Sequence, residues 1–180
     1  MSKSKEIILG VTGSIAAYKA CEIITRLKKH NINVTVVMTK DAEEFITPLT
    51  LQTLSGNKVV RGLFTLPDNV NPLHISLAQR CDLLLIAPAT ANIVAKLAAG
   101  MADEALTALA VSTRAPIMLC PAMNENMFKH KVTQANIARL KKLGYRFLGP
   151  QRGHLVCGPE GIGHLADVEK IVSEAIRTLR

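Results

Sequence analysis

The sequence predicts an α/β fold in which a doubly wound parallel sheet forms a single domain over residues 1–180. Three observations predict this fold. Short, continuous apolar runs recur along the chain, as expected of strands that are buried on both faces. Stretches with helical spacing of apolar residues separate these runs, and strands that alternate with helices build parallel sheets. The length of 180 residues, of which 48% are apolar and 20% charged, suits one hydrophobic core.

The apolar runs predict strands at residues 7–11, 33–39, 58–64, 82–89, 116–120 and 145–149. Helices are expected over residues 14–29, after Thr47, on either side of Gly100 and from Asp167 onward. Thr47 is typical of a helix N-cap, the Pro48 that follows it of a first turn, and Gly56 of a helix end. Residues 67–76, PDNVNPLHIS, are read as a polar loop.

The beginning of the chain, MSKSKEIILGV, is basic but contains neither a long apolar region nor a small-residue cleavage site. We therefore expect no signal peptide. No apolar run approaches the roughly 20 residues of a membrane span. The sequence thus predicts a cytoplasmic protein that does not bind membranes.

The net charge of +8 would suit a nucleic acid or an anionic small molecule. The lysine pairs at positions 28–29 and 141–142 fall at the ends of expected helices, where cations complement the helix dipole. Aromatic residues, which nucleic-acid binders use for base stacking, make up 3% of the chain and include no Trp. We therefore expect no nucleic-acid partner.

The four cysteines are far apart and form no CxxC pair, so the sequence predicts neither a zinc site nor a disulfide framework. Cys21, Cys81 and Cys120 are expected to be small core residues, since free cysteine packs like a hydrophobe. Cys157 differs, because the surrounding GHLVCGPEGIGHL is too rich in glycine for a packed core. Its thiol is therefore a candidate for chemistry.

The first predicted strand runs into GVTGSIAAYK, a glycine turn with Ser14 at a helix start. Such a turn offers backbone N–H groups and the positive end of a helix dipole to a phosphate. The sequence has the spacing of neither a dinucleotide fingerprint nor a P-loop, and the second strand ends at Thr39 without a ribose-binding acidic residue. A mononucleotide such as FMN fits better, with the hydroxyls of Ser14 and Thr39 as donors to its phosphate. A purely structural Gly-Ser turn is the alternative interpretation.

Two further segments have polar side chains where buried strands end. In APATANIVAKLAAG these are Thr90 and Asn92, and in PAMNENMF the residue is Asn124. Because ligands bind at the carboxyl ends of parallel strands, these side chains are expected at the same sheet edge as Ser14. The alternative interpretation of Thr90 is a simple helix cap.

His74, in NPLHISLAQRCD, is a candidate general base, because the ordinary pKa of histidine is about 6.5. A solvated or capping residue in a loop is the alternative interpretation. The other histidines show no metal-ligand spacing with one another, and no metal is expected.

Five segments that span nearly the whole chain carry one resemblance: GVTGSIAAYK, NPLHISL, APATANIVAKLAAGMAD, PAMNENMF and VCGPEGIG. Together they resemble the homo-oligomeric flavin-containing cysteine decarboxylases. The resemblance implies a Rossmann-like flavoprotein that binds FMN between the subunits of a homotrimer or a dodecamer of trimers. It also implies phosphopantothenoylcysteine as the substrate, and the phosphopantothenate-cysteine ligase as a partner, fused or separate. Two positions depart from the family: Phe128, where many members carry Trp, and His164, where bacterial relatives often carry Arg.

The resemblance also implies roles for individual residues. His74 is similar to the family's catalytic base, and Cys157 to its late proton donor. Asn124 matches the ligand of the substrate carboxylate, with Ala122 and Met123 in the same motif. The segments that match the flavin-binding motifs contain Gly13, Ser14, Ile15, Thr39, Thr90, Ala91 and Asn92.

The implied reaction explains why these residue types are needed. Loss of carbon dioxide from a cysteine would leave a carbanion without an electron sink. Oxidation of the CH2–SH group to a thioaldehyde, with FMN as oxidant, provides the sink, and decarboxylation then yields an enethiolate. His74 would be the base for the oxidation. The neutral amide of Asn124 would bind the carboxylate without a strong charge pairing that opposes its departure.

Three other functions are compatible with parts of the sequence. A flavin prenyltransferase would share the fold and the FMN site but has no use for His74, Asn124 and Cys157 together. A peptidyl-cysteine decarboxylase, which acts on a precursor peptide, would use all three. A flavin-binding regulatory subunit that inhibits a phosphatase would be expected to carry acidic extensions, which this sequence lacks.

Overall fold

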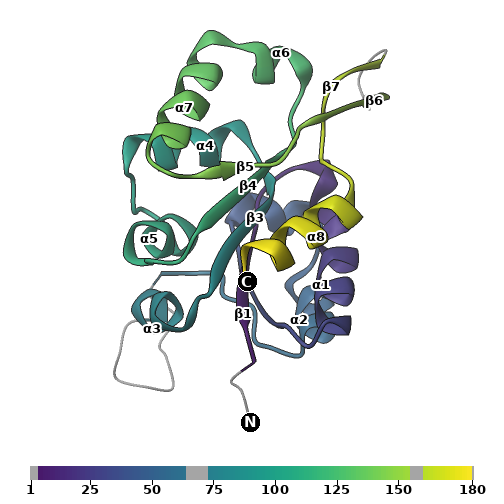
Figure 1. Cartoon of the computed structure of the whole chain (residues 1–180), viewed down its shortest axis with the longest axis vertical. Helices are drawn as coiled ribbons and strands as arrows, with labels where there is room; N and C mark the ends of the chain where they lie inside the picture. Colours follow the sequence, from purple (N-terminus) through teal and green to yellow (C-terminus); the bar gives the residue numbers. More distant parts are fainter. Residues whose placement is uncertain (1–3, 64–72, 155–159, 180) are drawn as a thin grey trace.

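A parallel sheet runs through the middle of the computed structural model, which describes residues 4–63, 73–154 and 160–179. Within these residues the sheet has five strands in the order β2-β1-β3-β4-β5, and every neighbouring pair is parallel (Figure 1). The strands are β1 (Glu6–Val11), β2 (Asn33–Met38), β3 (Leu83–Ala89), β4 (Ile117–Pro121) and β5 (Arg146–Phe147). The predicted doubly wound parallel sheet is confirmed.

Helices cover both faces of the sheet (Figure 1). On one face lie α1 (Ala20–Lys29), α2 (Pro48–Ser55) and α8 (Val168–Thr178). On the other face lie α3 (Leu73–Arg80), α4 (Ala91–Ala99), α5 (Ala105–Ser112) and α7 (Lys131–Lys142), which the short α6 (Glu125–Lys129) precedes.

The side chains of successive strand residues pack into two separate hydrophobic cores, one on each face of the sheet. In β1, Ile7 and Leu9 pack with the first set of helices, whereas Ile8 packs with the second. All three side chains are fully buried. This two-sided burial is why the strands appear in the sequence as unbroken apolar runs.

The first predicted helix begins differently from the prediction. Residues Ile15–Lys19 form a 3₁₀ helix, η1, and the α-helix starts only at Ala20. The tighter turn buries Ala16 and Ala17 in the first core. Helical periodicity alone does not distinguish these two helix types near a helix start, where 3₁₀ turns are frequent.

Two predictions between β2 and β3 are wrong. The described part of segment 58–64 is not a strand of the sheet, because only Val60 forms a bridge, with Val37. Arg61 instead pairs with Glu43, its Nη2 atom lying 2.7 Å from Oε2. The predicted polar loop 67–76 is also wrong at its end, because α3 starts at Leu73. Burial of Leu77 in the second core stabilises that helix, although the sequence around its start is polar.

A small hairpin that sequence analysis did not predict stands at the carboxyl end of the sheet. Its strands β6 (Gln151–His154) and β7 (Glu160–His164) pair antiparallel. The sequence indicated only that this segment is too rich in glycine for a packed core, because pairing with a partner strand has no local sequence signal. Cys157 lies between the two strands, outside the described residues.

The three other cysteines lie in or beside the two cores. Cys120 is fully buried, and Cys21 and Cys81 are half-buried. Burial raises the pKa of the Cys81 thiol to about 11 and also raises that of Cys120. The prediction of packed, unreactive thiols holds for Cys120 fully and for the other two in part. Among the helices that the structure describes, none has the length and apolar character that a bilayer crossing requires.

Candidate functional site

A cavity of about 150 Å³ lies at the carboxyl end of the sheet, where β1, β2 and β3 end. α1 follows β1 on one face, whereas the chain enters β3 from α3 on the other face, so the connections diverge between β1 and β3. Open parallel sheets bind ligands at such a switch point. The cavity lining includes four residues that the sequence predicted for a flavin: Gly13, Thr39, Thr90 and Asn92.

Thr39 has an unpaired hydroxyl in this cavity. Its side chain is buried, with 8% of the residue exposed, and Oγ1 has no hydrogen-bond partner within the described chain. Its backbone N–H donates to the carbonyl of Val11 at 3.1 Å, which ties the end of β2 to β1. An unsatisfied buried hydroxyl costs about 1–3 kcal/mol. A polar ligand group in the cavity would remove that cost.

Gly13 lines the cavity with backbone atoms only, and there is no room for a side chain at this position. A Cβ atom at this position would collide with Asp41, which follows β2 and also lines the cavity. The next residue, Ser14, is the N-cap of η1, and its Oγ accepts from the N–H of Ala16 at 3.3 Å. Ser14 and Ile15 are not among the described lining residues, and Ile15 is 57% exposed. The structure therefore brings only Gly13 of these three residues into the cavity.

Thr90 begins α4 beside the cavity. Its Oγ1 accepts from the N–H of Ile93 at 3.3 Å, so the helix-cap interpretation describes this hydroxyl. Asn92 follows in the first turn and is exposed to solvent at the cavity, whereas Ala91 is half-buried and is not among the described lining residues. Thr90 thus combines a structural contact with a position in the cavity wall.

Sequence analysis missed six lining residues: Thr12, Lys40, Asp41, Ile93, Lys96 and Glu104. Thr12 and Lys40 are direct neighbours of Gly13 and Thr39, and Asp41 follows Lys40, so the ends of the predicted strands could have indicated all three. Glu104 has no such signal, because it reaches the cavity from the N-cap of α5. Its position depends on how α4 packs beside α5.

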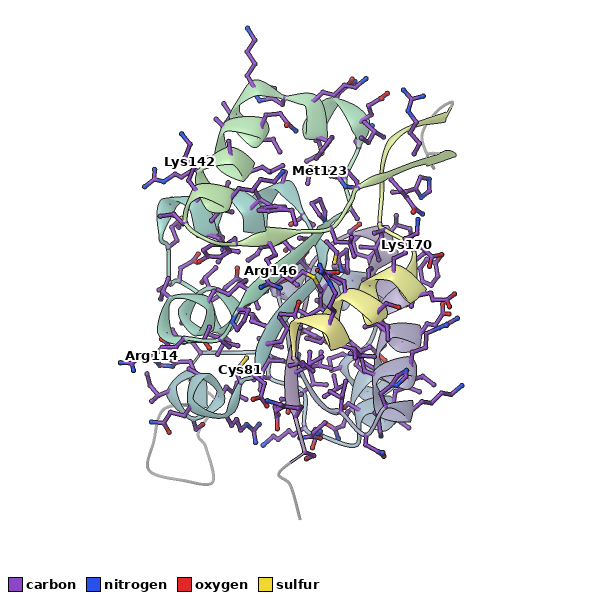
Figure 2. All side chains as sticks on the ribbon, in the orientation of Figure 1. Cys81, Arg114, Met123, Lys142, Arg146 and Lys170 are labelled. Atoms are coloured by element: carbon purple, nitrogen blue, oxygen red, sulfur yellow. The ribbon has the colours of Figure 1, made fainter. Side chains whose placement is uncertain are left out.

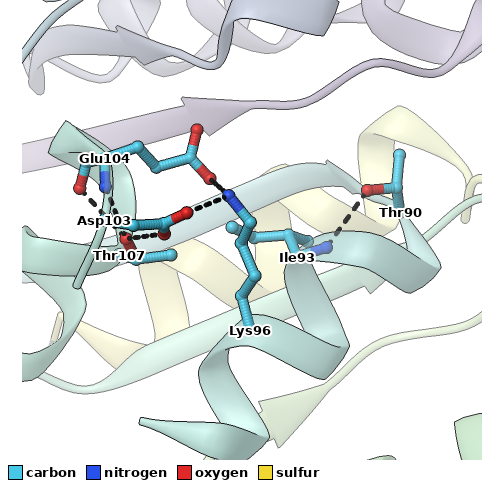
Figure 3. Close-up of polar contacts among 6 residues, drawn as sticks. All are labelled: Thr90, Ile93, Lys96, Asp103, Glu104 and Thr107. Carbon is cyan, nitrogen blue, oxygen red and sulfur yellow. Dashed lines mark hydrogen bonds and ion pairs between the residues drawn. The ribbon is translucent and has the colours of Figure 1, made fainter. Parts of the chain in front are cut away.

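Lys96 joins α4 to α5 along one wall of the cavity (Figure 3). Its ammonium nitrogen lies 2.8 Å from Asp103 Oδ2 and 3.0 Å from Glu104 Oε1. The hydrogen bond to Asp103 is the main reason that the pKa of Lys96 is raised, and it also holds the pKa of Asp103 below its ordinary value. Lys96 therefore neutralises part of the negative charge on this wall.

Asn124 also lies at the carboxyl end of the sheet, directly after β4. It is exposed and is the N-cap of α6, where its Oδ1 accepts from the N–H of Asn126 at 2.9 Å. That contact leaves the side-chain NH2 group as a donor. Ala122 is buried and its N–H donates to Ala89 at 3.0 Å, which joins the end of β4 to β3.

Met123 joins residues 121–124, the PAMN turn, to the β6–β7 hairpin. Its N–H donates to the carbonyl of Gly163 in β7 at 3.0 Å, and Figure 2 shows Met123 beside the base of that hairpin. The N–H of Ile162 donates to Glu125 Oε1 at 3.3 Å. The strand that follows Cys157 in sequence is therefore fastened to the turn that carries Asn124.

His74 is placed apart from the cavity. It lies at the start of α3, and its Nδ1 atom is buried without a hydrogen-bond partner in the part of the chain that the structure describes. Neither His74 nor Asn124 is among the described residues that line the cavity. A single chain therefore brings some of the predicted flavin-binding residues together in the cavity, but it does not bring His74 to that cavity. Cys157 cannot be placed, since it is outside the described residues.

Comparison with known proteins shows the family of the chain. A family model described as flavoprotein matches residues 1–180. The chain belongs to the flavoprotein family. The family supports a flavin as its cofactor. Among solved structures, the chain is similar to a mutant PPC decarboxylase complexed with pantothenoylaminoethenethiol, with a TM-score of 0.86 and 27% identity over 97% of this chain and 98% of that one. It is also similar to the FMN binding protein AtHal3, with a TM-score of 0.83 and 27% identity over 97% of this chain and 96% of that one.

Curated relatives fall into two length classes. A probable phosphopantothenoylcysteine decarboxylase of Streptococcus mutans is 46% identical over 173 residues, which are 95% of this flavoprotein and 97% of the relative. The coenzyme A biosynthesis bifunctional protein CoaBC of Vibrio vulnificus is 44% identical over 169 residues, which are 94% of this chain and 42% of the relative. This flavoprotein thus spans less than half of the bifunctional relatives that it matches.

Proposed function

We propose that this flavoprotein is an FMN-dependent phosphopantothenoylcysteine decarboxylase, which converts 4′-phosphopantothenoylcysteine to 4′-phosphopantetheine. The observation that carries the proposal is the match, over nearly the full length of both chains, to a relative named for this activity at 46% identity. The likeness to the structure of a PPC decarboxylase with a bound aminoethenethiol supports the same substrate class.

FMN fits the residues of the cavity. The unpaired hydroxyl of Thr39 would find a phosphate or ribityl oxygen as its partner, and the bare backbone at Gly13 allows a ligand to approach closely. Lys40 supplies a cation beside them. When bound, FMN would supply the two-electron oxidation of the substrate CH2–SH group and the later return of hydride.

The protein residues would bind the substrate and move its protons. The side-chain NH2 group of Asn124 would donate to the substrate carboxylate. His74 would take the thiol proton during oxidation, and Cys157 would return a proton once the enethiolate has formed. A thiol with a pKa of about 8.5 is mostly protonated at neutral pH and can serve as that acid.

A homotrimeric assembly, alone or as a dodecamer of trimers, belongs to the proposal. His74 does not reach the cavity of its own chain, which supports a site completed by His74 of a neighbouring subunit. Exposed apolar side chains occur on η1 and around the start of α2, and contact between subunits would bury them: Ile15, Tyr18, Phe45 and Leu49. A phosphopantothenate-cysteine ligase, fused to this chain or separate from it, would supply the substrate, and the match to part of a bifunctional relative supports such a partner.

A peptidyl-cysteine decarboxylase is the second candidate. The chain is similar to the FMN-dependent cysteine decarboxylase SpaF, with a TM-score of 0.84 and 28% identity over 98% of both chains. The two functions differ in what precedes the cysteine of the substrate. Peptide substrates would use the same oxidation and decarboxylation but would be released as enethiols.

The test is to supply the FMN-loaded protein with phosphopantothenoylcysteine or with a peptide that ends in cysteine. We expect carbon dioxide from the first substrate and a product with the mass of phosphopantetheine. Release of carbon dioxide from the peptide alone would favour the second candidate.

In Cys157→Ser we expect a product two hydrogens lighter than phosphopantetheine, because the enethiol is not reduced. Full conversion by that variant would contradict the role of Cys157.

A further inference from the structure

The pairing of β1 with β3 stops short of the cavity. The register runs from Ile7 opposite Leu83 to Gly10 opposite Ile86. Beyond that pair, β3 reaches Pro88, which has no backbone N–H to donate to a ladder. The turns that line the cavity lie on the far side of this break. A contact other than the ladder must hold them together.

A single hydroxyl makes that contact. Thr12 Oγ1 donates to the carbonyl of Pro88 at 2.8 Å and accepts from the N–H of Thr90 at 3.1 Å. Only 1% of Thr12 is exposed, so water does not compete for either hydrogen bond. The carbonyl of Thr12 also accepts from the N–H of Ser14 at 2.8 Å, which closes the glycine turn. Thr12 therefore contacts both turns of the cavity.

We propose that Thr12 is a positioning residue for the cofactor, which sets the spacing between the Gly13 turn and the Thr90 cap. This inference rests on the proposed binding of FMN. Gly13 and Thr90 line the cavity from opposite sides of the switch point, and the hydroxyl of Thr90 already caps Ile93. Thr12 does not need to touch the ligand to act. It keeps the two walls at one separation, so that both contact the ligand together.

The other strand ends at the cavity are joined by backbone contacts. The N–H of Thr39 donates to Val11 between β2 and β1, and the N–H of Ala122 donates to Ala89 between β4 and β3. These two contacts involve no side-chain atom. Beyond the end of the β1–β3 ladder, the contact between these two strand ends in the described chain instead uses the side chain of Thr12. Position 12 is therefore where a change of one side-chain oxygen atom can alter the spacing of the cavity walls while every other lining residue stays the same.

The test compares Thr12→Val with Thr12→Ser by titration of FMN into the purified full chain, followed by absorbance or fluorescence. Valine keeps the shape of threonine but leaves the Pro88 carbonyl and the Thr90 N–H without a partner. We expect Thr12→Val to raise the Kd for FMN by about tenfold or more, and Thr12→Ser to stay within about threefold of the natural chain, because serine restores the bridge. Thr35→Val is the matched control. Thr35 is also buried and its hydroxyl is paired, to Glu6 at 2.7 Å, but it lies at the amino end of β2.

The outcomes separate this inference from the proposed function. If the natural chain does not bind FMN, the proposed function fails. If it binds FMN and Thr12→Val binds equally well, the positioning role is overturned while the function stands. Equal losses in Thr12→Val, Thr12→Ser and Thr35→Val would also overturn it, since general destabilisation would explain them. If Thr12→Val does not fold, Thr12→Ala is measured at a temperature where its near-UV circular dichroism matches that of the natural chain. The positioning role then requires that Thr12→Ala also raises the Kd for FMN by about tenfold or more.

Discussion

A Cβ atom on Gly13 would lie 2.5 Å from the Cβ atom of Asp41 and 3.1 Å from its carbonyl carbon and oxygen. The turn after β1 and the turn after β2 are therefore in direct backbone contact beside the cavity. An alanine at position 13 would have to push these turns apart.

We expect Gly13→Ala to weaken FMN binding by about tenfold or more, which corresponds to about 1.4 kcal/mol. Gly10→Ala is the matched control, because its Cβ would meet the side chain of Leu106 at 2.7 Å in the second core, away from the cavity. That variant should lose about 1–3 kcal/mol of unfolding free energy by overpacking but keep its affinity for FMN. Equilibrium dialysis and urea unfolding measure the two quantities. Unchanged affinity in Gly13→Ala would refute the proposed place of the cofactor.

Thr39→Val should have opposite effects on the free and the FMN-bound protein. The substitution removes a buried hydroxyl that has no partner in the described chain, so the ligand-free protein should become no less stable. FMN should bind about tenfold more weakly, because its polar partner is lost. Thr35→Val should instead lower the free energy of unfolding and leave FMN binding intact, since Thr35 donates to Glu6. Thermal unfolding with and without FMN separates these effects, and the idea fails if Thr39→Val destabilises only the ligand-free protein.

Lys96→Met leaves the carboxylates of Asp103 and Glu104 without their shared cation. Because Glu104 lines the cavity, we expect weaker binding of anionic FMN, by about tenfold. Lys5→Met is the control, since it removes the same charge from a pair with Asp82 at the amino end of the sheet. An affinity for FMN that is equal in the two variants would argue against a role for Lys96.

The same pair makes a prediction about pH. The contact with Lys96 holds the pKa of Asp103 below its ordinary value. The stabilisation from this pair is therefore present above the unfolded-state pKa, about 3.9, and is lost as the pH falls through the lower, folded-state pKa. NMR titration of the Asp103 carboxyl should show its pKa rising in Lys96→Met. A pKa that does not move would mean that the contact is absent in solution.

Gly163→Ala should affect the substrate and not the cofactor. A Cβ atom there would collide with the carbonyl oxygen of Met123, so β7 would move away from the PAMN turn. We expect a higher KM for phosphopantothenoylcysteine with an unchanged Kd for FMN. In the control Gly153→Ala, the added atom meets the ring of His164 within the hairpin and leaves Met123 untouched. A KM equal to that of the natural chain in Gly163→Ala would show that the contact has no part in substrate binding.

His74→Asn should greatly slow the oxidation of substrate while FMN stays bound, because the proposed base acts on the substrate and not on the phosphate of the cofactor. Stopped-flow bleaching of the flavin absorbance measures the oxidation, and we expect a loss of at least about a hundredfold, in the range for a general base. His30→Asn is the control, since His30 is exposed at the end of α1. Bleaching at the normal rate in His74→Asn would disprove the assignment.

Part of the candidate cavity could be predicted from the sequence, because parallel sheets bind ligands where their strands end. Gly13, Thr39, Thr90 and Asn92 each follow a buried apolar run, and all four line one cavity. Ser14, Ile15 and Ala91 stand in the same segments but not in that lining. Their side chains point according to the local turn geometry, which a motif does not specify.

The sequence by itself determined the sheet and its helical layers, because two-sided burial and helical spacing leave a regular pattern of apolar residues. The family was indicated separately, by the resemblance of five segments to the flavin-containing cysteine decarboxylases. Only the tertiary structure decided which residues meet at the cavity. Thr12 bridges the ends of β1 and β3, which are far apart in the chain. Lys96 of α4 holds Glu104 at the start of α5, the next helix along the chain. The β6–β7 hairpin likewise depends on pairing, and α3 on the burial of Leu77. Such contacts depend on how whole elements pack, and no local pattern of residues records that packing.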